Sequence, residues 1–347
     1  MNTGTAPVIA EVRGHIGHLT LNRPAGLNAL TLEMVRLLRS QLEQWATNTA
    51  IQAVVLRGAG ERAFCAGGDI RGIYDKHLAG EPGIEEFFSE EYALDGYIHA
   101  YPKPVLALMD GFVLGGGMGL AQGASIRLVT ERARLGMPET GIGYFPDVGG
   151  SYFLPRLPGE IGIYLGITGN HIDAADALHS GLADLCLHSN QLGRLDQLLD
   201  TFDASSNLQA HLAELGPCTL PSSRLAQLQP AIDLHFSQPD IASIRHSLTT
   251  ETRSAYADWA TTTVKVIDNR SPIAMAVTLE LLRRGRHLSL EQCFAMELHL
   301  DRQWFEGGDI VEGVRALLVD KDKQPRWNPA HIDQVDAGRV AAFFADL

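Results

Sequence analysis

The segment from residue 104 to residue 119 constrains the fold more strongly than any other part of the chain. It begins with residues 104–109 (PVLALM), a strand candidate without the polar positions that a solvent-facing side would need. Helices or a second sheet should therefore cover both faces of this strand. The segment continues into Gly115, Gly116 and Gly117, which can bring backbone N–H groups close to a ligand and should open a helix. We predict an α/β fold around this buried strand.

The composition excludes several classes of partner. The chain has 347 residues, of which 45% are hydrophobic and 20% are charged, as in an ordinary folded globular protein. Its formal net charge of −13 offers no basic surface to nucleic acid or to an anionic membrane, so we expect small-molecule partners. No run of about eighteen apolar residues is present, and residues 1–7 lack the basic and apolar parts of an export signal. We expect neither export nor a membrane span.

The cysteines and histidines form none of the common metal or nucleophile motifs. Cys65, Cys186, Cys218 and Cys293 are scattered without C-x-x-C spacing, which argues against a disulfide framework or a zinc site. Because a reducing compartment fits this pattern, we expect a cytoplasmic protein. The 13 histidines form no His-Glu-x-x-His motif, and no Gly-x-Ser-x-Gly motif accompanies them, so we expect no metal site and no serine hydrolase. Without an identifiable histidine partner, Cys65 is interpreted as a packing residue.

The order of the elements predicts an α/β region followed by a helical one. Residues 8–12 and 16–21 flank a glycine turn and predict a hairpin, and Thr31 can cap a following amphipathic helix. Later helix signals are the sequences Ser271-Pro272, Ser289-x-x-Gln292 and Asp309-x-x-Glu312. We predict a core over residues 1–200 and a mostly helical region over residues 201–347 that completes the same unit.

Two carboxylates stand eight residues apart in a segment that is too rich in Gly and Pro for a regular helix or central strand. Glu139 and Asp147 lie within residues 138–150 (PETGIGYFPDVGG). They could be a surface acid and a turn residue, which is the ordinary interpretation of such a pair. Neighbouring apolar side chains would instead dry the site and raise the cost of ionising a carboxyl group. The segment therefore predicts carboxyl groups tuned for acid–base work.

Two glycine motifs could supply an oxyanion site. Gly68 follows a strand candidate that ends at Gly58, and Gly116 lies in the glycine run; their N–H groups could stabilise a developing negative charge on an acyl oxygen. A simple turn at Gly68 and close helix packing at Gly116 are the structural alternatives. A phosphate cradle is disfavoured because the run lacks the Lys-Ser/Thr of a P-loop, and Leu120 stands where G-x-G-x-x-G needs glycine.

Several motifs together resemble the enoyl-CoA hydratase/isomerase (crotonase) superfamily. They are residues 22–24 (NRP), 28–30 (NAL), 64–69 (FCAGGD) and 110–117 (DGFVLGGG). Residues 138–150 and the late segment 312–327 resemble the 3-hydroxyisobutyryl-CoA hydrolase branch of that superfamily. The hydratases place a catalytic Glu two residues after the glycine triplet, where this chain has Gly119, and this departure favours the hydrolase branch.

The resemblance implies a crotonase-like spiral of ββα units that hydrolyses an acyl-CoA thioester. It implies that the thioester oxygen lies between the N–H groups of Gly68 and Gly116, that Glu139 and Asp147 are the functional acids, and that Glu91 contacts substrate. Gly116, Glu139 and Asp147 would contact the substrate too. It also implies 3-hydroxyisobutyryl-CoA as substrate, a place in valine breakdown, and no cofactor apart from the CoA of the substrate. Superfamily members often form trimers, so a homo-oligomer is among the expected assemblies.

Two other functions stay open from the sequence. The first is an enoyl-CoA hydratase or isomerase that uses Glu139 alone. The second is a non-catalytic acyl-CoA-binding protein with the same fold. Release of free thiol from a hydroxyacyl-CoA separates both of them from the hydrolase.

Overall fold

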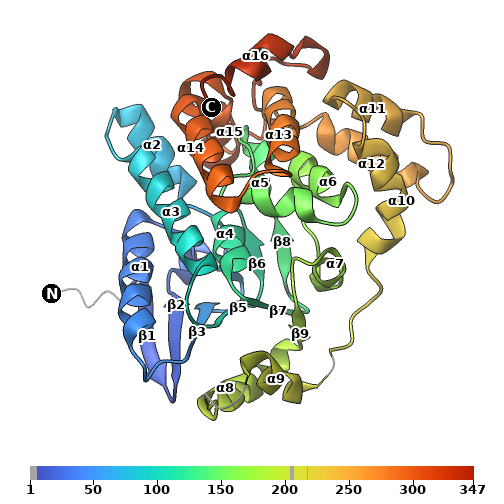
Figure 1. Ribbon diagram of the computed structural model, residues 1–347. Helices are drawn as coiled ribbons and strands as arrows, with labels where there is room; N and C mark the ends of the chain where they lie inside the picture. Colours follow the sequence, from blue (N-terminus) through green and yellow to red (C-terminus); the bar gives the residue numbers. More distant parts are fainter. Residues whose placement is uncertain (1–5, 204–206, 217) are drawn as a thin grey trace. The chain divides into compact units, whose positions relative to one another are not determined.

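The computed structural model describes residues 6–203, 207–216 and 218–347 (Figure 1). The chain divides into two compact units. Unit 1 is made of Met1–Gly68, Glu90–Leu135 and Ile172–Ser223. Unit 2 is made of Asp69–Ser89, Gly136–His171 and Arg224–Leu347. The predicted core over residues 1–200 and helical region over residues 201–347 stay a prediction, although every described element after residue 200 is helical.

Unit 1 contains a six-stranded sheet in the order β1-β2-β3-β5-β7-β9. β1 and β2 form the predicted antiparallel hairpin, and each later neighbour in the sheet is parallel. The strands are β1 (Val8–Arg13), β2 (Ile16–Leu21), β3 (Ala53–Gly58), β5 (Val105–Met109), β7 (Ile126–Thr130) and β9 (Leu185–Leu187).

Both faces of this sheet are covered, as the apolar sequence of β5 predicts. All five residues of β5 are buried. On one face, Leu106 and Leu108 belong to a core cluster with Leu195 and Leu199 of α8. α1 covers the other face: its Trp45 ring packs on Gly17 of β2, where an added Cβ would lie 2.4 Å from the ring. The helices of unit 1 are α1 (Leu32–Thr47), α4 (Gly116–Gly123), α7 (Ala174–Ser180), α8 (Leu192–Asp200) and α9 (Leu208–Leu212).

A second, three-stranded sheet carries the two glycine motifs. Its order is β4-β6-β8, with β4 (Ala63–Cys65), β6 (Phe112–Leu114) and β8 (Arg134–Gly136). β4 and β6 are parallel, so their carboxyl ends meet at one edge of the sheet. The glycine run opens α4 as predicted, with Gly115 at φ 49° before the first turn.

Unit 2 is dominated by helices. Its helices are α2 (Ile70–Ala79), α5 (Gly150–Phe153), α6 (Ile161–Thr168), α10 (Arg224–Phe236), α11 (Ile241–Thr249), α12 (Ala257–Ile267), α13 (Pro272–Gly285), α14 (Leu290–Gly307), α15 (Ile310–Val314) and α16 (Ala337–Ala342), and α3 (Ile84–His99) contributes residues to both units. The predicted capping box of Ser289 and Gln292 is present at α14. None of the described helices is long and apolar enough to cross a membrane.

The helix that begins after Asp309 differs from its sequence signal. α15 starts where the Asp309-x-x-Glu312 pattern predicts, but the Asp309 side chain makes no cap. Its carboxylate instead accepts hydrogen bonds from the Ser271 hydroxyl and the Asn328 N–H, while Glu312 pairs with Arg315. Tertiary partners therefore outcompete the local cap at this helix.

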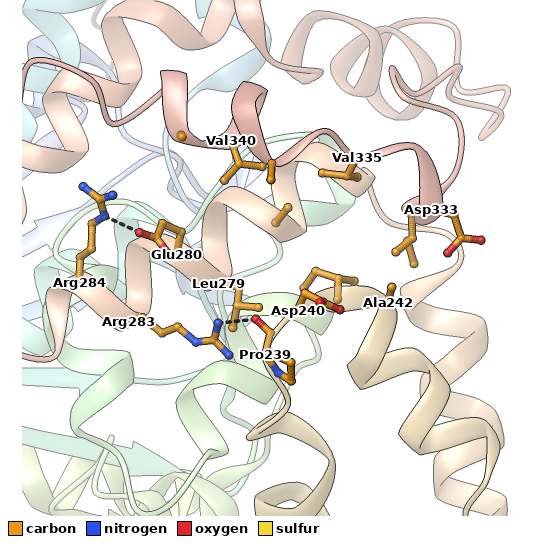
Figure 2. Close-up of a pocket in the computed structure, with 15 residues that line it drawn as sticks. Pro239, Asp240, Ala242, Leu279, Glu280, Arg283, Arg284, Asp333, Val335 and Val340 are labelled. Atoms are coloured by element: carbon orange, nitrogen blue, oxygen red, sulfur yellow. Dashed lines mark hydrogen bonds and ion pairs between the residues drawn. The ribbon is translucent and has the colours of Figure 1, made fainter.

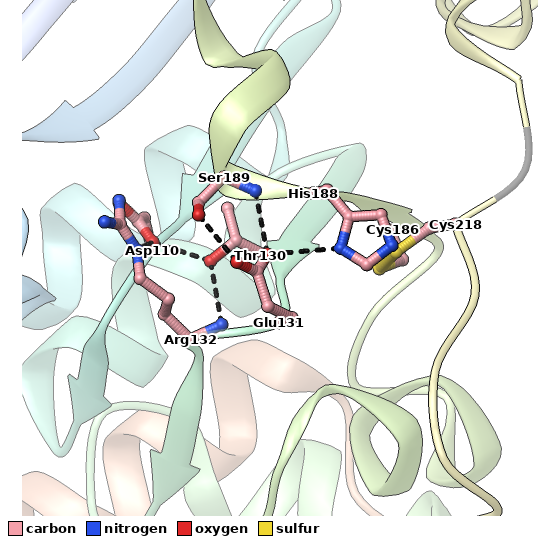
Figure 3. Close-up of a disulfide and its surroundings, with 8 residues drawn as sticks. All are labelled: Asp110, Thr130, Glu131, Arg132, Cys186, His188, Ser189 and Cys218. Carbon is pink, nitrogen blue, oxygen red and sulfur yellow. Dashed lines mark hydrogen bonds and ion pairs between the residues drawn. A yellow bond between two sulfur atoms is a disulfide. The ribbon is translucent and has the colours of Figure 1, made fainter.

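The cysteine spacing did not predict the one disulfide found among the described residues. Cys186 of β9 bonds to Cys218, with Cα atoms 5.5 Å apart (Figure 3). The partners are 32 residues apart and become neighbours only through the path of the chain after β9. The expectation that the cysteines form no disulfide is therefore wrong for this pair, whereas Cys65 and Cys293 are free and buried.

Candidate active site

Unit 1 contains the two predicted N–H donors, which belong to the main chain. Gly67 and Gly68 follow β4, and Gly115 and Gly116 follow β6, at the shared edge of these parallel strands. Gly67 has φ 108° and Gly115 has φ 49°, conformations that side chains rarely adopt. A Cβ added at Gly116 would lie 3.4 Å from the Gly68 nitrogen. The structure therefore brings the two predicted N–H donors together.

Glu91 lies against the same glycine. It is 2% exposed on α3, and a Cβ at Gly116 would lie 2.3 Å from its Oε1 atom. Any side chain at this position would displace either the carboxylate or the backbone. Gly116 therefore lets α4 begin within contact of Glu91, the residue that the resemblance places beside the substrate.

Cys65 also lies in this region, at the end of β4. Its side chain is fully buried, and its thiol donates to the Gly67 carbonyl at 3.6 Å. Burial raises the pKa of the Cys65 thiol to about 12, and the charges of Glu91 and Asp95 contribute in the same direction. A thiol in this state is a poor nucleophile, which supports its interpretation as a packing residue.

Unit 2 contains the two predicted acids as a pair of carboxyl groups. Glu139 begins a short 3₁₀ helix, Glu139–Ile142, and Asp147 follows Pro146 in irregular chain. Each of the two acids is only 6% exposed. Tyr144 and Phe145 lie between the two acids in the sequence, and both are buried. This agrees with the prediction that apolar side chains exclude water from the segment.

Glu139 has the electrostatic signature of a functional acid. Its Oε2 atom is buried and has no hydrogen-bond partner on any residue that the structure describes. Burial holds the pKa of Glu139 well above its ordinary value of 4.5, and the negative charge of Asp147 raises it further. A raised pKa makes this carboxyl group a stronger base once it is ionised, which suits it to proton transfer. The surface-acid interpretation is excluded by this burial.

A third acid that sequence reasoning missed supports the same segment. Glu297 of α14 is fully buried and accepts hydrogen bonds from the N–H of Gly149 and from the N–H and hydroxyl of Ser151. Burial raises the pKa of Glu297 to about 8, with the charge of Asp147 adding to the shift. The sequence signal that could have identified Glu297 is an acidic residue within the apolar stripe of α14, beside Met296 and Leu300.

The comparisons with known proteins identify the family. The model of the family described as Enoyl-CoA hydratase/isomerase matches residues 16–344. The chain belongs to the enoyl-CoA hydratase/isomerase family. The resemblance noted in the sequence is thereby confirmed over nearly the whole chain, including the segments that carry Gly68, Gly116, Glu139 and Asp147.

Relatives within the enoyl-CoA hydratase/isomerase family carry a more specific name. The chain is 38% identical to a mitochondrial 3-hydroxyisobutyryl-CoA hydrolase of Danio rerio, over 98% of this chain and 90% of the relative. It is 37% identical to the protein of the same name from Homo sapiens, over 98% of this chain and 89% of the relative. These matches extend through the helical C-terminal region.

Two solved structures confirm the crotonase-like α/β fold. One is a carnitinyl-CoA dehydratase from Mycobacterium thermoresistibile, with TM-score 0.91 and 37% identity over 99% of this chain and 97% of that one. The other is an enoyl-CoA hydratase from Rhodobacter sphaeroides, with TM-score 0.89 and 35% identity over 99% of this chain and 98% of that one.

A cavity elsewhere in unit 2 contains none of the candidate residues. It has a volume of about 570 Å³ and lies among α11, α13 and α16 (Figure 2). Its two arginines are already engaged, because Arg283 donates to the carbonyls of Gln238 and Pro239, and Arg284 pairs with Glu280. Within the described ranges, no group of three or more His, Cys, Asp or Glu side chains is arranged to hold a metal ion.

Proposed function

We propose that the chain is a CoA-thioester hydrolase that converts 3-hydroxyisobutyryl-CoA and water to 3-hydroxyisobutyrate and CoA. The observation that carries the proposal is the match to proteins named 3-hydroxyisobutyryl-CoA hydrolase, which extends over 98% of the chain in two of them. The buried carboxyl group of Glu139 supports it independently, since thioester hydrolysis needs a nucleophile or a base.

The proposed role of unit 1 is to bind the thioester oxygen. Attack on a thioester carbon moves negative charge onto its carbonyl oxygen, and two backbone N–H groups can accept that charge without reorganising. We assign these donors to Gly68 and Gly116, whose close approach supports the assignment. We assign Glu91, which touches the same glycine position, to substrate contact.

The proposed role of the acids is to deliver the nucleophile. Glu139 either attacks the thioester carbon and expels CoA as thiolate, which takes up a proton, so that water then hydrolyses the mixed anhydride, or it removes a proton from a water that attacks the same carbon and expels CoA. Asp147 orients the hydroxyl group of the acyl chain or assists the proton transfer. Both routes require Glu139 to be ionised when it acts, and its raised pKa makes it a stronger base once ionised.

A thiol-release screen tests the proposal most directly. The purified chain is assayed with 3-hydroxyisobutyryl-CoA, 3-hydroxypropionyl-CoA and crotonyl-CoA, with free thiol detected colorimetrically. We expect saturable thiol release from the hydroxyacyl-CoAs, with the branched one preferred. Binding of all three without turnover would support a non-catalytic acyl-CoA-binding protein instead.

An enoyl-CoA hydratase is the second candidate, and the solved structures favour it. The two matching structures are described as a dehydratase and a hydratase, at 37% and 35% identity, close to the identities of the hydrolase relatives. The crotonyl-CoA arm of the screen separates the candidates. Loss of the enoyl absorbance without free thiol would establish hydration and remove the hydrolase.

We also propose a cytoplasmic location, a role in valine breakdown and assembly into a homo-oligomer. Cell fractionation tests the first, growth of a deletion strain on valine tests the second, and mass measurement in solution tests the third. The vertebrate relatives are named as mitochondrial proteins, which makes the first measurement the most informative of the three.

A further inference from the structure

The chain directly after Asp147 adopts a conformation that its sequence does not favour. Val148 has φ 50° and Gly149 has φ 84°, so two successive residues are left-handed. A β-branched residue such as valine is disfavoured in this region, because its side chain crowds the backbone. Something outside the turn must therefore hold it, and Val148 is itself 3% exposed.

Glu297 provides that hold from α14. Its Oε2 atom accepts the Gly149 N–H at 2.8 Å. Its Oε1 atom accepts the Ser151 N–H at 2.9 Å and the Ser151 hydroxyl at 2.5 Å. Both carboxyl oxygens are thus used by the four residues that follow Asp147, at a site from which solvent is excluded.

Neighbouring helices are shaped to keep this arrangement. A Cβ at Gly285 of α13 would lie 1.9 Å from the Ser151 carbonyl oxygen, so only glycine lets α13 approach so closely. Phe294 of α14 lies 3.4 Å from the position that a Cβ of Gly149 would take. The turn is therefore enclosed by packing and bound at its polar groups by one carboxyl group.

We propose that Glu297 is a positioning residue, which fixes the Val148–Gly149 turn and thereby sets the direction of the Asp147 side chain. This inference rests on the proposed hydrolase function. Glu297 does not touch the reacting atoms in this role; it acts through Asp147. Its effect on the rate should therefore depend on whether Asp147 is present.

The chain offers a matched control in unit 1. Glu131 accepts the Ser189 N–H on Oε2 at 2.7 Å and the Ser189 hydroxyl on Oε1 at 2.6 Å, so it too binds the N–H and the hydroxyl of one serine (Figure 3). Its side chain is 36% exposed. Glu131→Gln therefore makes the same chemical change at a residue that has no proposed role in the reaction.

The test compares Glu297→Gln with this control in the thiol-release assay. Glutamine has one acceptor oxygen where glutamate has two, so either Gly149 or Ser151 loses its acceptor and the turn relaxes. We expect kcat to fall by about 100-fold, as for a small misplacement of a reacting group, with KM changed little. Glu131→Gln should keep the kcat of the unmodified protein.

A double variant separates positioning from general destabilisation. In the Asp147→Asn background, Glu297→Gln should lower the residual kcat by less than about two-fold, because Glu297 acts only through Asp147. A further loss as large as that in the unmodified background would overturn the inference. The inference would also be overturned if the parent protein releases thiol and Glu297→Gln alone has the same kcat as the parent.

Two outcomes need their own interpretation. If Glu297→Gln does not fold, Ser151→Ala keeps the carboxyl group and removes one donor; its kcat should fall about five-fold, and only when Asp147 is present. An unchanged kcat in Ser151→Ala would then overturn the inference. If the parent protein releases no thiol from any of the acyl-CoAs, the proposed hydrolase function is wrong, and the proposed role of Glu297, which depends on it, is wrong too.

Discussion

The candidate residues of unit 1 and those of unit 2 present their chemistry in different ways. In unit 1 the proposed donors are the main-chain N–H groups of Gly68 and Gly116, which follow two parallel strands and do not titrate. In unit 2 the proposed groups are the side chains of Glu139 and Asp147, and burial and the charge of Asp147 raise the pKa of Glu139. A change in the first region should therefore alter the rate at every pH, whereas a change in the second should also alter its pH dependence.

Replacement of Glu139 should have the largest effect. Glu139→Gln keeps the size of the side chain but removes the nucleophile or base, so kcat should fall by about 10²- to 10⁴-fold. Binding of CoA, measured by calorimetry, should survive. Glu280→Gln, in an exposed pair with Arg284, serves as the control and should leave kcat unchanged. Full turnover in Glu139→Gln would remove the proposed mechanism.

Gly116→Ala tests the main-chain region. The added methyl group would lie 2.3 Å from Glu91 Oε1, so either this carboxylate or the Gly116 backbone must move, and at 3.4 Å from the Gly68 nitrogen it would occupy the space beside both N–H groups. We expect a loss of about 3 kcal/mol of transition-state stabilisation, which is the order of one oxyanion donor. The shape of the pH–rate profile should stay the same. Gly193→Ala in α8, where a Cβ meets no atom within 4 Å, is the control.

These two regions also differ in how much of them could be predicted from the sequence. The glycine pair could be found because its signal is local: each glycine lies in a short run of consecutive glycines that can be read from the sequence without a distant partner. The long apolar strand, the hairpin and the capped helix α14 were predictable for the same reason. The three-residue strands β4 and β6 were not, since they are too short to show a period of two.

What the sequence could not predict depends on contacts between distant residues. Glu297 supports residues that lie 146 and 148 positions earlier in the chain, and only an acid within an apolar helical stripe pointed to it. Cys186 and Cys218 likewise meet only in the folded chain. Asp309 shows the same principle, because Ser271 and Asn328 draw its carboxylate away from the expected cap.

Asp147→Asn tests the coupling within the carboxyl region. The charge of Asp147 raises the pKa of Glu139, so removing that charge should lower it. Because Glu139 must be ionised to act, activity is lost as the pH falls through its pKa. The acid limb of the pH–rate profile should therefore move to lower pH in Asp147→Asn, beside a large drop in kcat. An acid limb at the parental pH would show that the two acids act independently.

The raised pKa of Glu297 should make the stability of the protein depend on pH. The pKa of Glu297 is about 8 in the folded chain against an ordinary value of 4.5, so the folded state binds this proton more strongly than the unfolded state. Its contribution to stability is complete below pH 4.5 and is lost as the pH rises toward 8. Glu297→Gln should reduce this decline of Tm with pH, which thermal denaturation at pH 5 and pH 8 can measure. An equal decline in both proteins would contradict the assignment.

Cys65→Ala should have the smallest effect. It tests whether a side chain beside the glycines of unit 1 takes part in the reaction. Burial raises the pKa of this thiol to about 12, so it stays protonated at neutral pH and cannot serve as the nucleophile. Removing it should leave kcat within about two-fold while costing roughly 1 kcal/mol of stability, as for a small buried side chain. Cys293→Ala, a buried free thiol in unit 2, should behave alike in both measurements. A collapse of kcat in Cys65→Ala alone would mean that the thiol, and not only the backbone beside it, takes part in the reaction, and the division between a main-chain region and a side-chain region would no longer hold.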